Sequence, residues 1–248
     1  MLNRGVRLPK VVLAPIANQQ YLLRIALAPG LVWPQDGFRS NGEALEVWPS
    51  PLDEQAVLHL LQPVLGAGSR QLVGIHPGGS ARWQTKRWDL NRWARVCEAL
   101  AARNVQVVVV GGPEEQALGE ALCRMTTTPP ANLIGRTNLM ELACLIQRCD
   151  VFMAHDSSSL HLAAAMGTPT LALFGPTDPR RHVPPTFVGQ VIAKEVFCSP
   201  CYSPRCRTIT HACMKRISVE EVLSAVFALL ADAETTGVRT HAGTQAPT

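Results

Sequence analysis

The chain has 248 residues, of which 47% are hydrophobic and 17% are charged, and its formal net charge is +4 at pH 7. This length fits one large domain or two small ones, and the composition supplies a sizeable core. No stretch approaches the roughly 18 uninterrupted apolar residues of a membrane span. The N-terminus lacks the apolar core and cleavage site of a signal peptide, so we expect a cytoplasmic protein. The mild positive charge is compatible with an anionic ligand, an anionic membrane surface or a solvated basic face.

The first 70 residues give short and irregular patterns. We predict a strand over Val11–Ile16, a helix over Gln19–Ala28, a short strand over Leu45–Trp48 and a helix over Pro51–Leu65. These elements are too few to close a core of their own. Residues 1–70 are therefore predicted to be the remnant of a preceding domain and a linker.

From residue 71 onward, strands alternate with helices. We predict strands over Gln71–Ile75, Val105–Val110, Asn132–Ile134, Val151–Ala154, Thr170–Phe174 and Val188–Ile192, and helices over Leu90–Arg103, Glu114–Met125, Asn138–Gln147, Leu160–Met166 and Ser218–Ala231. Asp89 and Ser218 have the side chains of N-cap residues. This alternation is typical of a parallel sheet with helices on both faces, so residues 71–232 are predicted to form an α/β, Rossmann-like domain. The polar tail, residues 233–248, is predicted to be disordered.

The stretch Val151–Pro179 predicts a strand, a polar loop, a short helix, a second strand and a second polar loop. Gly167 follows the helix at the position where a left-handed residue ends many helices. Two buried strands joined by a helix form a right-handed unit, and both polar loops then lie at the carboxyl edge of the sheet. Ligands bind at this edge in open α/β sheets, so we expect function in the loops around Asp156 and Asp178.

The loop His76–Arg87 follows the first strand of the predicted domain. Gly78 and Gly79 let backbone N–H groups approach a phosphate closely, and the Ser80 hydroxyl adds a donor. Lys86 and Arg87 carry charges that would neutralise a diphosphate. The loop lacks the residue order of a Walker A loop and the glycine spacing of dinucleotide sites. A turn that only reverses the chain is the alternative interpretation.

A second loop, Gly111–Glu115, also follows a strand. The Glu114 carboxylate has the acceptors to bind the two hydroxyl groups of a ribose. The alternative, which the spacing alone favours, is a plain turn in which Glu114 and Glu115 complement the dipole of the next helix.

A third loop, Asp156–His161, opens the short helix. Ser157 and Ser158 would offer hydroxyl and backbone donors to an anion at the helix N-terminus, whereas Asp156 suits a sugar hydroxyl. The alternative is that Asp156 or Ser157 only caps the helix. His161 lies one turn further on, and a lone histidine on a short apolar helix is more often a core residue than a catalyst.

Four of the eight cysteines lie close together, in the pattern Cys198-x₂-Cys201-x₄-Cys206-x₆-Cys213. Four thiolates in 16 residues have the number of ligands for tetrahedral zinc. The wider spacings do not repeat the first knuckle, however, so reduced thiols in a surface loop are an equal alternative. Apart from this open alternative, we assign no metal ligand in the sequence.

Together these motifs resemble the glycosyltransferase family that contains the ADP-heptose:lipopolysaccharide heptosyltransferases. The resemblance runs from about Gln71 to Leu230, and Asp156–Pro179 is its most specific block. The matching segments are His76–Ser80, Lys86–Trp88, Gly111–Glu115, Asp156–Pro169, Phe174–Pro179 and, as in some members, Cys198–Met214.

The resemblance implies a GT-B fold, in which the C-terminal domain binds a nucleotide-sugar and the N-terminal domain binds a lipid acceptor. It implies that the donor is a nucleotide-diphosphate sugar such as ADP-heptose and that the acceptor is a lipid-linked saccharide at the inner membrane face, with no nucleic acid partner and no cofactor. The implied substrate-binding residues are Gly79, Ser80 and Lys86 at the diphosphate, Glu114 at the ribose, Asp156 at the donor sugar, Ser157 and Ser158 near the phosphates, and His161 in support of that loop.

The chain departs from the family pattern in two places. The family has Asp-Ser/Thr-Gly where this chain has Asp156-Ser157-Ser158, and serine does not adopt a left-handed backbone as easily as glycine. Residues 1–70 also lack the strand, glycine-rich loop and acidic residue that hold the implied catalytic base, so no catalytic residue is assigned. We expect a truncated chain that binds the donor but transfers poorly. The alternative is a non-catalytic nucleotide-binding module or a decayed family member.

Overall fold

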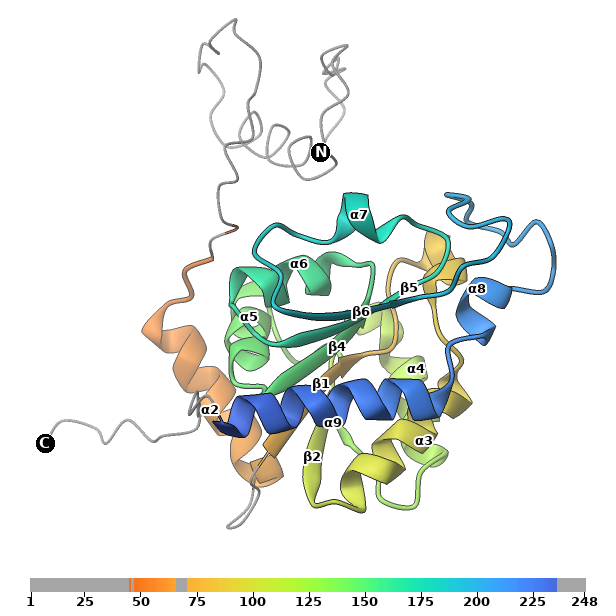
Figure 1. Ribbon diagram of the computed structural model, residues 1–248. Coiled ribbons are helices and arrows are strands. Elements are labelled where there is room, and N and C mark those ends of the chain that lie inside the picture. The colour runs from red at the N-terminus through yellow and green to blue at the C-terminus, as the bar shows by residue number, and fades with distance from the viewer. Residues whose placement is uncertain (1–44, 46, 66–70, 236–248) are drawn as a thin grey trace, which may run out of the picture.

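The structure is a computed structural model that describes residues 45, 47–65 and 71–235. Its centre is a six-stranded parallel sheet with the strand order β3-β2-β1-β4-β5-β6 (Figure 1). The strands are β1 (Gln71–His76), β2 (Val105–Val109), β3 (Ala131–Asn132), β4 (Val151–His155), β5 (Thr170–Phe174) and β6 (Gly189–Ala193). The α-helices are α2 (Pro51–Leu65), α3 (Leu90–Ala101), α4 (Gln116–Arg124), α5 (Leu139–Gln147), α6 (Ser158–Ala165), α7 (Pro179–His182), α8 (Ala212–Lys215) and α9 (Val219–Thr235), and the 3₁₀ helices are η2 (Ala81–Lys86) and η3 (Pro113–Glu115).

The order of the strands reverses between β1 and β4. The chain proceeds outward from β1 through β2 to β3, then returns to the centre and proceeds outward on the other side through β4, β5 and β6. Ile75 in β1 pairs with Met153 in β4, and His76 pairs with Ala154, so the two strands end side by side. The loops after them diverge to opposite faces of the sheet, which opens a crevice at the carboxyl edge.

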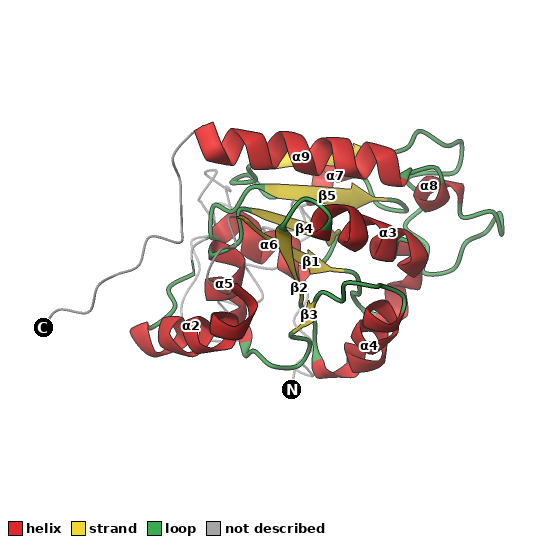
Figure 2. Cartoon of the chain, turned by 90° about the horizontal axis from the view of Figure 1, so that it is seen from below, coloured by secondary structure: helices red, strands yellow, loops and turns green. Residues whose placement is uncertain are grey.

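Helices cover both faces of the sheet, as predicted (Figure 2). Each face has its own cluster of buried apolar side chains. On one face, α3 and α9 contribute Trp93, Leu100 and Val226 to a cluster that includes Ile75. On the other face, α2, α5 and α6 pack against the sheet in a second cluster that includes Phe152. Strands β4 and β5 are buried along their whole length, which explains why they are continuous apolar runs in the sequence.

Several predicted elements differ from the structure in their bounds. The described residues between Leu45 and Trp48 form no strand; Val47 instead packs on the α2 side of the sheet. The helix predicted from Glu114 begins one residue earlier, as the 3₁₀ helix η3 with Pro113 at its first position. The last helix continues to Thr235. The elements predicted over Val11–Ile16 and Gln19–Ala28 lie outside the described residues.

The predicted helix signals are present. The Asp89 side chain accepts a hydrogen bond from the backbone N–H of Asn91 at 2.9 Å, and that of Ser218 accepts from Glu221 at 3.1 Å. Gly167 has the left-handed φ of +69° expected where α6 ends. No helix in the described part of the chain is long and apolar enough to span a membrane.

Candidate functional site

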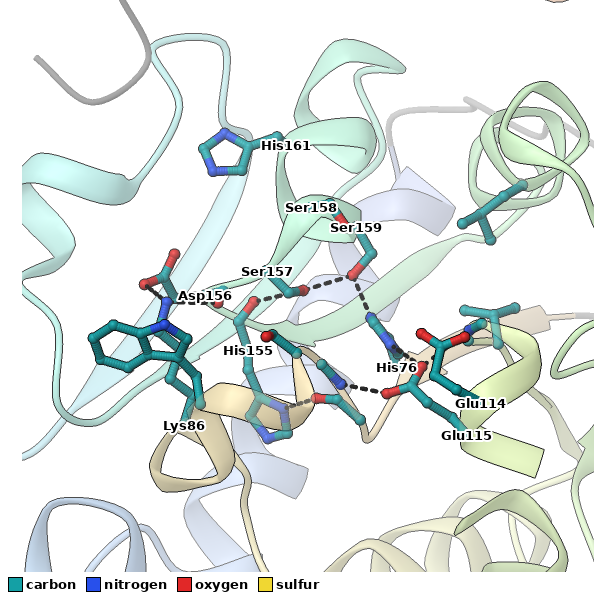
Figure 3. A pocket seen from close by; sticks show the side chains of 18 of the residues that line it. His76, Lys86, Glu114, Glu115, His155, Asp156, Ser157, Ser158, Ser159 and His161 are labelled. Carbon is teal, nitrogen blue, oxygen red and sulfur yellow. Dashed lines mark hydrogen bonds and ion pairs between the residues drawn. The ribbon is translucent and has the colours of Figure 1, made fainter. Parts of the chain in front are cut away.

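A pocket of about 750 Å³ lies at the carboxyl edge of the sheet, where β1 and β4 diverge. It is formed by the loops that follow β1, β2 and β4, together with the first turns of α5 and α6 (Figure 3). All eight residues predicted from the sequence line it: Gly79, Ser80, Lys86, Glu114, Asp156, Ser157, Ser158 and His161. Loops that are far apart in the sequence therefore meet at one site.

Glu115 holds two of these loops together. Its Oε1 accepts a hydrogen bond from the backbone N–H of Gly79 at 2.6 Å, and its Oε2 accepts from Gly112 at 3.0 Å. Oε2 also lies 3.0 Å from Nε2 of His76. Burial raises the pKa of Glu115, but hydrogen bonds from His76 and the two amides outweigh burial and lower the pKa to about 2. This carboxylate is therefore ionised, and the protein itself fills three of its roughly four acceptor positions.

His76 extends this network to the third loop. Because an ionised carboxylate only accepts, His76 donates to Glu115 through Nε2. Nδ1 lies 2.7 Å from Oγ of Ser159, which lies 2.9 Å from Oγ of Ser157 (Figure 3). The Ser157 hydroxyl also donates to the His155 carbonyl at 3.3 Å. Because its proton is used in this bond, the Ser157 oxygen keeps a lone pair for a further donor at the wall of the pocket.

His155, at the end of β4, fixes the turn that contains Gly78 and Gly79, which we call the glycine turn. Its Nε2 accepts from the backbone N–H of Trp88 at 2.9 Å, and its Nδ1 donates to the carbonyl of Gly78 at 3.1 Å. Burial lowers the pKa of His155 to about 3, so the ring is neutral. One tautomer satisfies both bonds, and the turn that precedes Ser80 is fixed in place.

Asp156 and Lys86 form the charged part of the pocket. Their side chains make an ion pair with Nζ 2.7 Å from Oδ2, and Nζ also donates to the Asp156 carbonyl at 3.2 Å. His182 lies 3.9 Å from Oδ1 of Asp156, and the Lys86 ammonium lies 5.1 Å from the centre of the Trp83 ring. The Lys86 side chain is 20% exposed, so its charge faces both Asp156 and the open pocket.

Two neutral imidazoles complete this wall. Burial lowers the pKa of His161 and of His182, and this effect outweighs the nearby charge of Asp156. His161 is on α6 and half-buried, and its ring points toward the same space as Asp156 in Figure 3. It is therefore a lining residue and not the core residue that its sequence context favours.

The far end of the pocket is apolar. Val110 from the end of β2 and Leu139 and Leu142 from α5 line it, and Leu139 is 61% exposed. The exposed carboxylate of Glu114 stands between this end and the glycine turn. The pocket thus changes from an apolar shelf, through a carboxylate, to a donor-rich turn and a charged end.

Residues 41–210 match the profile of Glycosyltransferase family 9 (heptosyltransferase). The chain belongs to this family. Over 177 residues it is 27% identical to lipooligosaccharide heptosyltransferase 2 of Campylobacter jejuni, a match that covers 70% of this chain and 55% of that protein. Over 122 residues it is 34% identical to lipooligosaccharide heptosyltransferase 2 of Haemophilus influenzae, covering 48% and 35% of the two chains.

Solved structures of family 9 have the same fold. The ADP-heptose lipopolysaccharide heptosyltransferase II of Escherichia coli superposes with a TM-score of 0.63 at 25% identity, over 82% of this chain and 56% of that chain. A family 9 member from Veillonella parvula gives 0.68 at 21% identity, over 92% and 63%. These GT-B neighbours and the parallel sheet confirm the predicted fold class. The chain spans about half the length of the Campylobacter and E. coli relatives.

Asp178 and Arg87, which the sequence led us to expect near a ligand of this family 9 protein, make other contacts instead. Asp178 does not line the pocket: it caps α7 by accepting from the Arg180 backbone N–H at 3.0 Å, and its carboxylate pairs with the Arg180 side chain at 2.8 Å. Arg87 donates to the carbonyl of Gly79 at 2.5 Å and lies 3.7 Å from Glu115. Of Lys86 and Arg87, Lys86 is the one whose positive charge faces the pocket.

Sequence reasoning missed Glu115, His76, His155, Ser159 and His182, which also line the pocket. Glu115 is adjacent to Glu114, and the predicted helix start at Glu114 put both in one first turn. Adjacent side chains in a helical turn point in different directions, and here the carboxylate of Glu115 is buried and that of Glu114 is exposed. The sequence contains one signal for two of the histidines: each is the last residue of a central strand, His76 in β1 and His155 in β4.

Ser158 causes no strain at the position where the family resemblance leads us to expect glycine. It is the first residue of α6, and the left-handed non-glycine residues in the described chain are Asn104, Tyr202, Ile209 and His211. The geometry of the loop therefore does not require glycine.

The four clustered cysteines line a separate cavity of about 400 Å³. Cys213 is buried and the other three are half-buried. Within the described ranges, no three side chains of His, Cys, Asp or Glu are arranged to hold a metal ion. The geometry gives the zinc alternative no support, and it is compatible with reduced thiols.

Proposed function

We propose that the pocket binds a nucleotide-diphosphate sugar of the ADP-heptose type, as the donor in glycosyl transfer. The proposal rests above all on the exchangeable ion pair of Lys86 and Asp156 at the switch point of the sheet. A diphosphate that binds Lys86 releases the Asp156 carboxylate, which is then free to accept a sugar hydroxyl. Phosphate and sugar groups are thus recognised together, because each takes one partner of the pair.

The remaining lining residues fit the other parts of this ligand. The backbone of Gly79, the Ser80 hydroxyl and the N-terminus of α6 at Ser158 supply donors to the diphosphate. Glu114 is placed to accept from ribose hydroxyls, and the apolar shelf with Leu139 suits the face of a base. Ser157 presents an acceptor lone pair, and with His161 it fits the donor sugar better than a phosphate.

In the proposed reaction, an acceptor hydroxyl attacks the anomeric carbon from the face opposite the diphosphate, with inversion. The bond from that carbon to the diphosphate oxygen breaks, and the bonding electrons leave with the nucleotide. Lys86 and the loop N–H groups stabilise the charge that develops on the leaving oxygen. The proton of the acceptor hydroxyl passes to a general base.

Donor binding is testable by calorimetry with ADP and with an ADP-sugar. Lys86→Ala is expected to weaken both by about tenfold or more, because a charge-assisted contact to phosphate is lost. The matched control is Lys194→Ala. It breaks another lysine–carboxylate ion pair, in which Nζ of Lys194 lies 2.6 Å from Oε1 of Glu221, and neither residue lines the pocket. Equal affinities for the two variants would rule the proposed diphosphate site out.

We further propose that residues 71–232 are the donor half of a two-domain enzyme, with residues 1–70 as part of its acceptor half. The lipid-linked acceptor would then be met at the inner face of the cytoplasmic membrane. Three acids line the pocket, and each has another role in this proposal: Glu115 joins the loops, Asp156 accepts a sugar hydroxyl and Glu114 accepts from the ribose, so none of them is assigned as the base. Weak transfer by the isolated chain is the expected result of an assay with donor and lipid acceptor.

A non-catalytic nucleotide-binding module is the second candidate, and the other roles of these three acids favour it. Binding of ADP with no transfer, even when an acceptor domain from a relative is supplied in trans, would select the module. Restored transfer under those conditions would select the enzyme.

A further inference from the structure

Two of the most exposed apolar side chains of the described residues lie in one segment. Phe197 is 95% exposed and Ile209 is 89% exposed. Both lie between β6 and α8, in a segment that continues through α8 from Phe197 to Arg216 and that we name the basic loop. Scattered apolar residues on a surface are ordinary, but two that are almost fully exposed in one loop indicate a contact surface.

The same segment holds the net charge of the whole chain. Arg205, Arg207, Lys215 and Arg216 are its four cations, and it contains no aspartate or glutamate. Since the chain as a whole has a net charge of +4, all other charged residues cancel. All four cationic side chains are exposed. The basic loop therefore combines positive charge and apolar side chains on a protein that is otherwise neutral.

The basic loop is firmly built. The Thr85 hydroxyl donates to the carbonyl of Ser203 at 2.8 Å, and His211 Nε2 donates to the Thr85 carbonyl at 2.6 Å. Ser199 Oγ donates to the carbonyl of Gly175 at 2.6 Å. These bonds fix the base of the loop against η2 and the end of β5. Phe197 and Ile209 are thus held outward without the entropy cost of ordering the loop on contact.

The position of the loop relates it to the donor pocket. It follows β6, so it projects from the same carboxyl edge as the pocket, on the side of α8 in Figures 1 and 2. Thr85, which anchors it, is adjacent in sequence to Lys86. The ring of Tyr202 in the loop lies 5.7 Å from that of His182, a lining residue of the pocket.

We propose that the basic loop docks on the surface of an anionic lipid bilayer, with Phe197 and Ile209 inserted among the headgroups. Cations that flank isolated apolar side chains match such a surface, because the cations meet lipid phosphates while the apolar groups leave water. A protein partner would need a broader apolar core than two side chains supply. The docking itself is argued without the proposed function. Only its biological role rests on that function: docking would hold the donor pocket at the plane of a lipid-linked acceptor.

The test is co-sedimentation of the full chain with vesicles of phosphatidylcholine alone or mixed with phosphatidylglycerol. Binding is expected only to the anionic vesicles and is expected to weaken with added salt. Removing two charges by Arg205→Gln with Arg207→Gln should reduce partitioning by about fivefold for each charge. Phe197→Ser with Ile209→Ser should reduce it further, whereas Thr210→Lys, an added cation at an exposed position, should strengthen it.

Matched controls carry the same changes elsewhere. Arg95→Gln with Arg124→Gln removes two exposed charges from α3 and α4, and Trp48→Ser with Leu52→Ser removes two side chains that are 78% and 76% exposed near α2. Loop variants that bind like these controls would overturn the inference. Equal binding to neutral vesicles would also overturn it, as would a change in oligomeric state caused by the loop variants without any vesicle binding.

Calorimetry with ADP on the same variants separates the two proposals. The loop variants should keep the affinity of the unmodified chain, because none of the changed residues lines the pocket. Loss of vesicle binding with retained ADP binding supports the loop inference. Vesicle binding by a chain that does not bind ADP would retain the loop inference and reject the proposed function.

Discussion

Two carboxylates in the pocket have the same burial and opposite surroundings. The side chains of Glu115 and Asp156 are each 6% exposed. Glu115 accepts from two backbone amides and from the buried imidazole of His76, and the fold of the loops fixes the position of both amides. Asp156 is held by the ammonium of Lys86, at the end of a flexible chain that is partly open to solvent.

The difference separates scaffold from binding group. A carboxylate that is satisfied by fixed donors lowers the free energy of the fold and offers little to a ligand. A carboxylate held by one mobile cation keeps its charge compensated in the empty pocket and exchanges partners when a ligand arrives. Burial and charge alone do not distinguish these roles; the mobility of the partner does.

Glu115→Gln should have the largest effect, on stability. The fall of the Glu115 pKa from 4.5 to about 2 corresponds to about 3 kcal/mol of stability at neutral pH. Because the folded pKa is depressed, this contribution is complete above pH 4.5 and is lost as the pH falls toward 2. Urea unfolding at pH 7 should show a loss of about 3 kcal/mol that shrinks as the pH is lowered through this window.

Glu114→Gln is the matched control for this prediction. Glu114 is the preceding residue, is exposed and makes no comparable hydrogen bonds to the loops. Its replacement should change the free energy of unfolding by less than about 0.5 kcal/mol. Equal effects of the two substitutions would mean that Glu115 is not a scaffold residue.

His155 should give the next largest effect, as a dependence of stability on pH. Burial lowers its pKa from 6.5 to about 3, so the unfolded chain binds this proton more readily than the folded one. Stability is therefore lost as the pH falls below 6.5, by about 2 kcal/mol at pH 5. His155→Gln does not titrate, so it should be less stable at pH 7 but vary less between pH 7 and pH 5. An unchanged slope would assign the pH dependence to other groups.

Much of the fold follows from the sequence, because strands that are buried on both faces are continuous apolar runs. The stretch Val151–Pro179 predicts two strands and a helix within one or two residues of β4, α6 and β5. The predicted strand over Leu45–Trp48 failed because a short apolar run does not show whether a neighbouring strand exists to pair with it. Only the assembled sheet decides that.

The site was predictable as a set of loops but not as a set of contacts. Residues at the carboxyl ends of parallel strands share one edge, which is sufficient to bring Lys86 and Asp156 into one pocket. Their pairing, and the choice of Glu115 over Glu114 as the buried acid, depends on side-chain directions in a 3₁₀ turn. A helical periodicity cannot encode such a turn.

Asp156→Asn should have a moderate effect that differs between ligands. Replacing the carboxylate by an amide removes a negative charge near the proposed diphosphate and frees Lys86, so ADP should bind about fivefold more tightly. An ADP-sugar should gain less, because the acceptor for its sugar hydroxyl is weakened. The ratio of ADP-sugar to ADP affinity, measured by calorimetry, should therefore fall.

Asp178→Asn is the control for the Asp156 substitution, since Asp178 pairs with Arg180 outside the pocket. It should leave both affinities unchanged. If Asp156→Asn changed the affinities for ADP and the ADP-sugar by the same factor, Asp156 would have no contact with the sugar. The comparison with Glu115 would then reduce to a difference in stability alone.

Ser158→Gly should have the smallest effect, and it tests the boundary between scaffold and binding group. Because Ser158 has a right-handed helical backbone at the start of α6, glycine relieves no strain there and costs about 0.5 kcal/mol of stability through chain entropy. The backbone donor that faces the diphosphate is the same in both variants, so ADP affinity should change by less than about twofold. Ser157→Ala removes the last hydroxyl in the series of hydrogen bonds from Glu115 through His76 and Ser159. It should lower the affinity for the ADP-sugar more than Ser158→Gly does. A large gain in affinity on Ser158→Gly would show that the serine side chain, and not the backbone, limits how closely the ligand approaches α6.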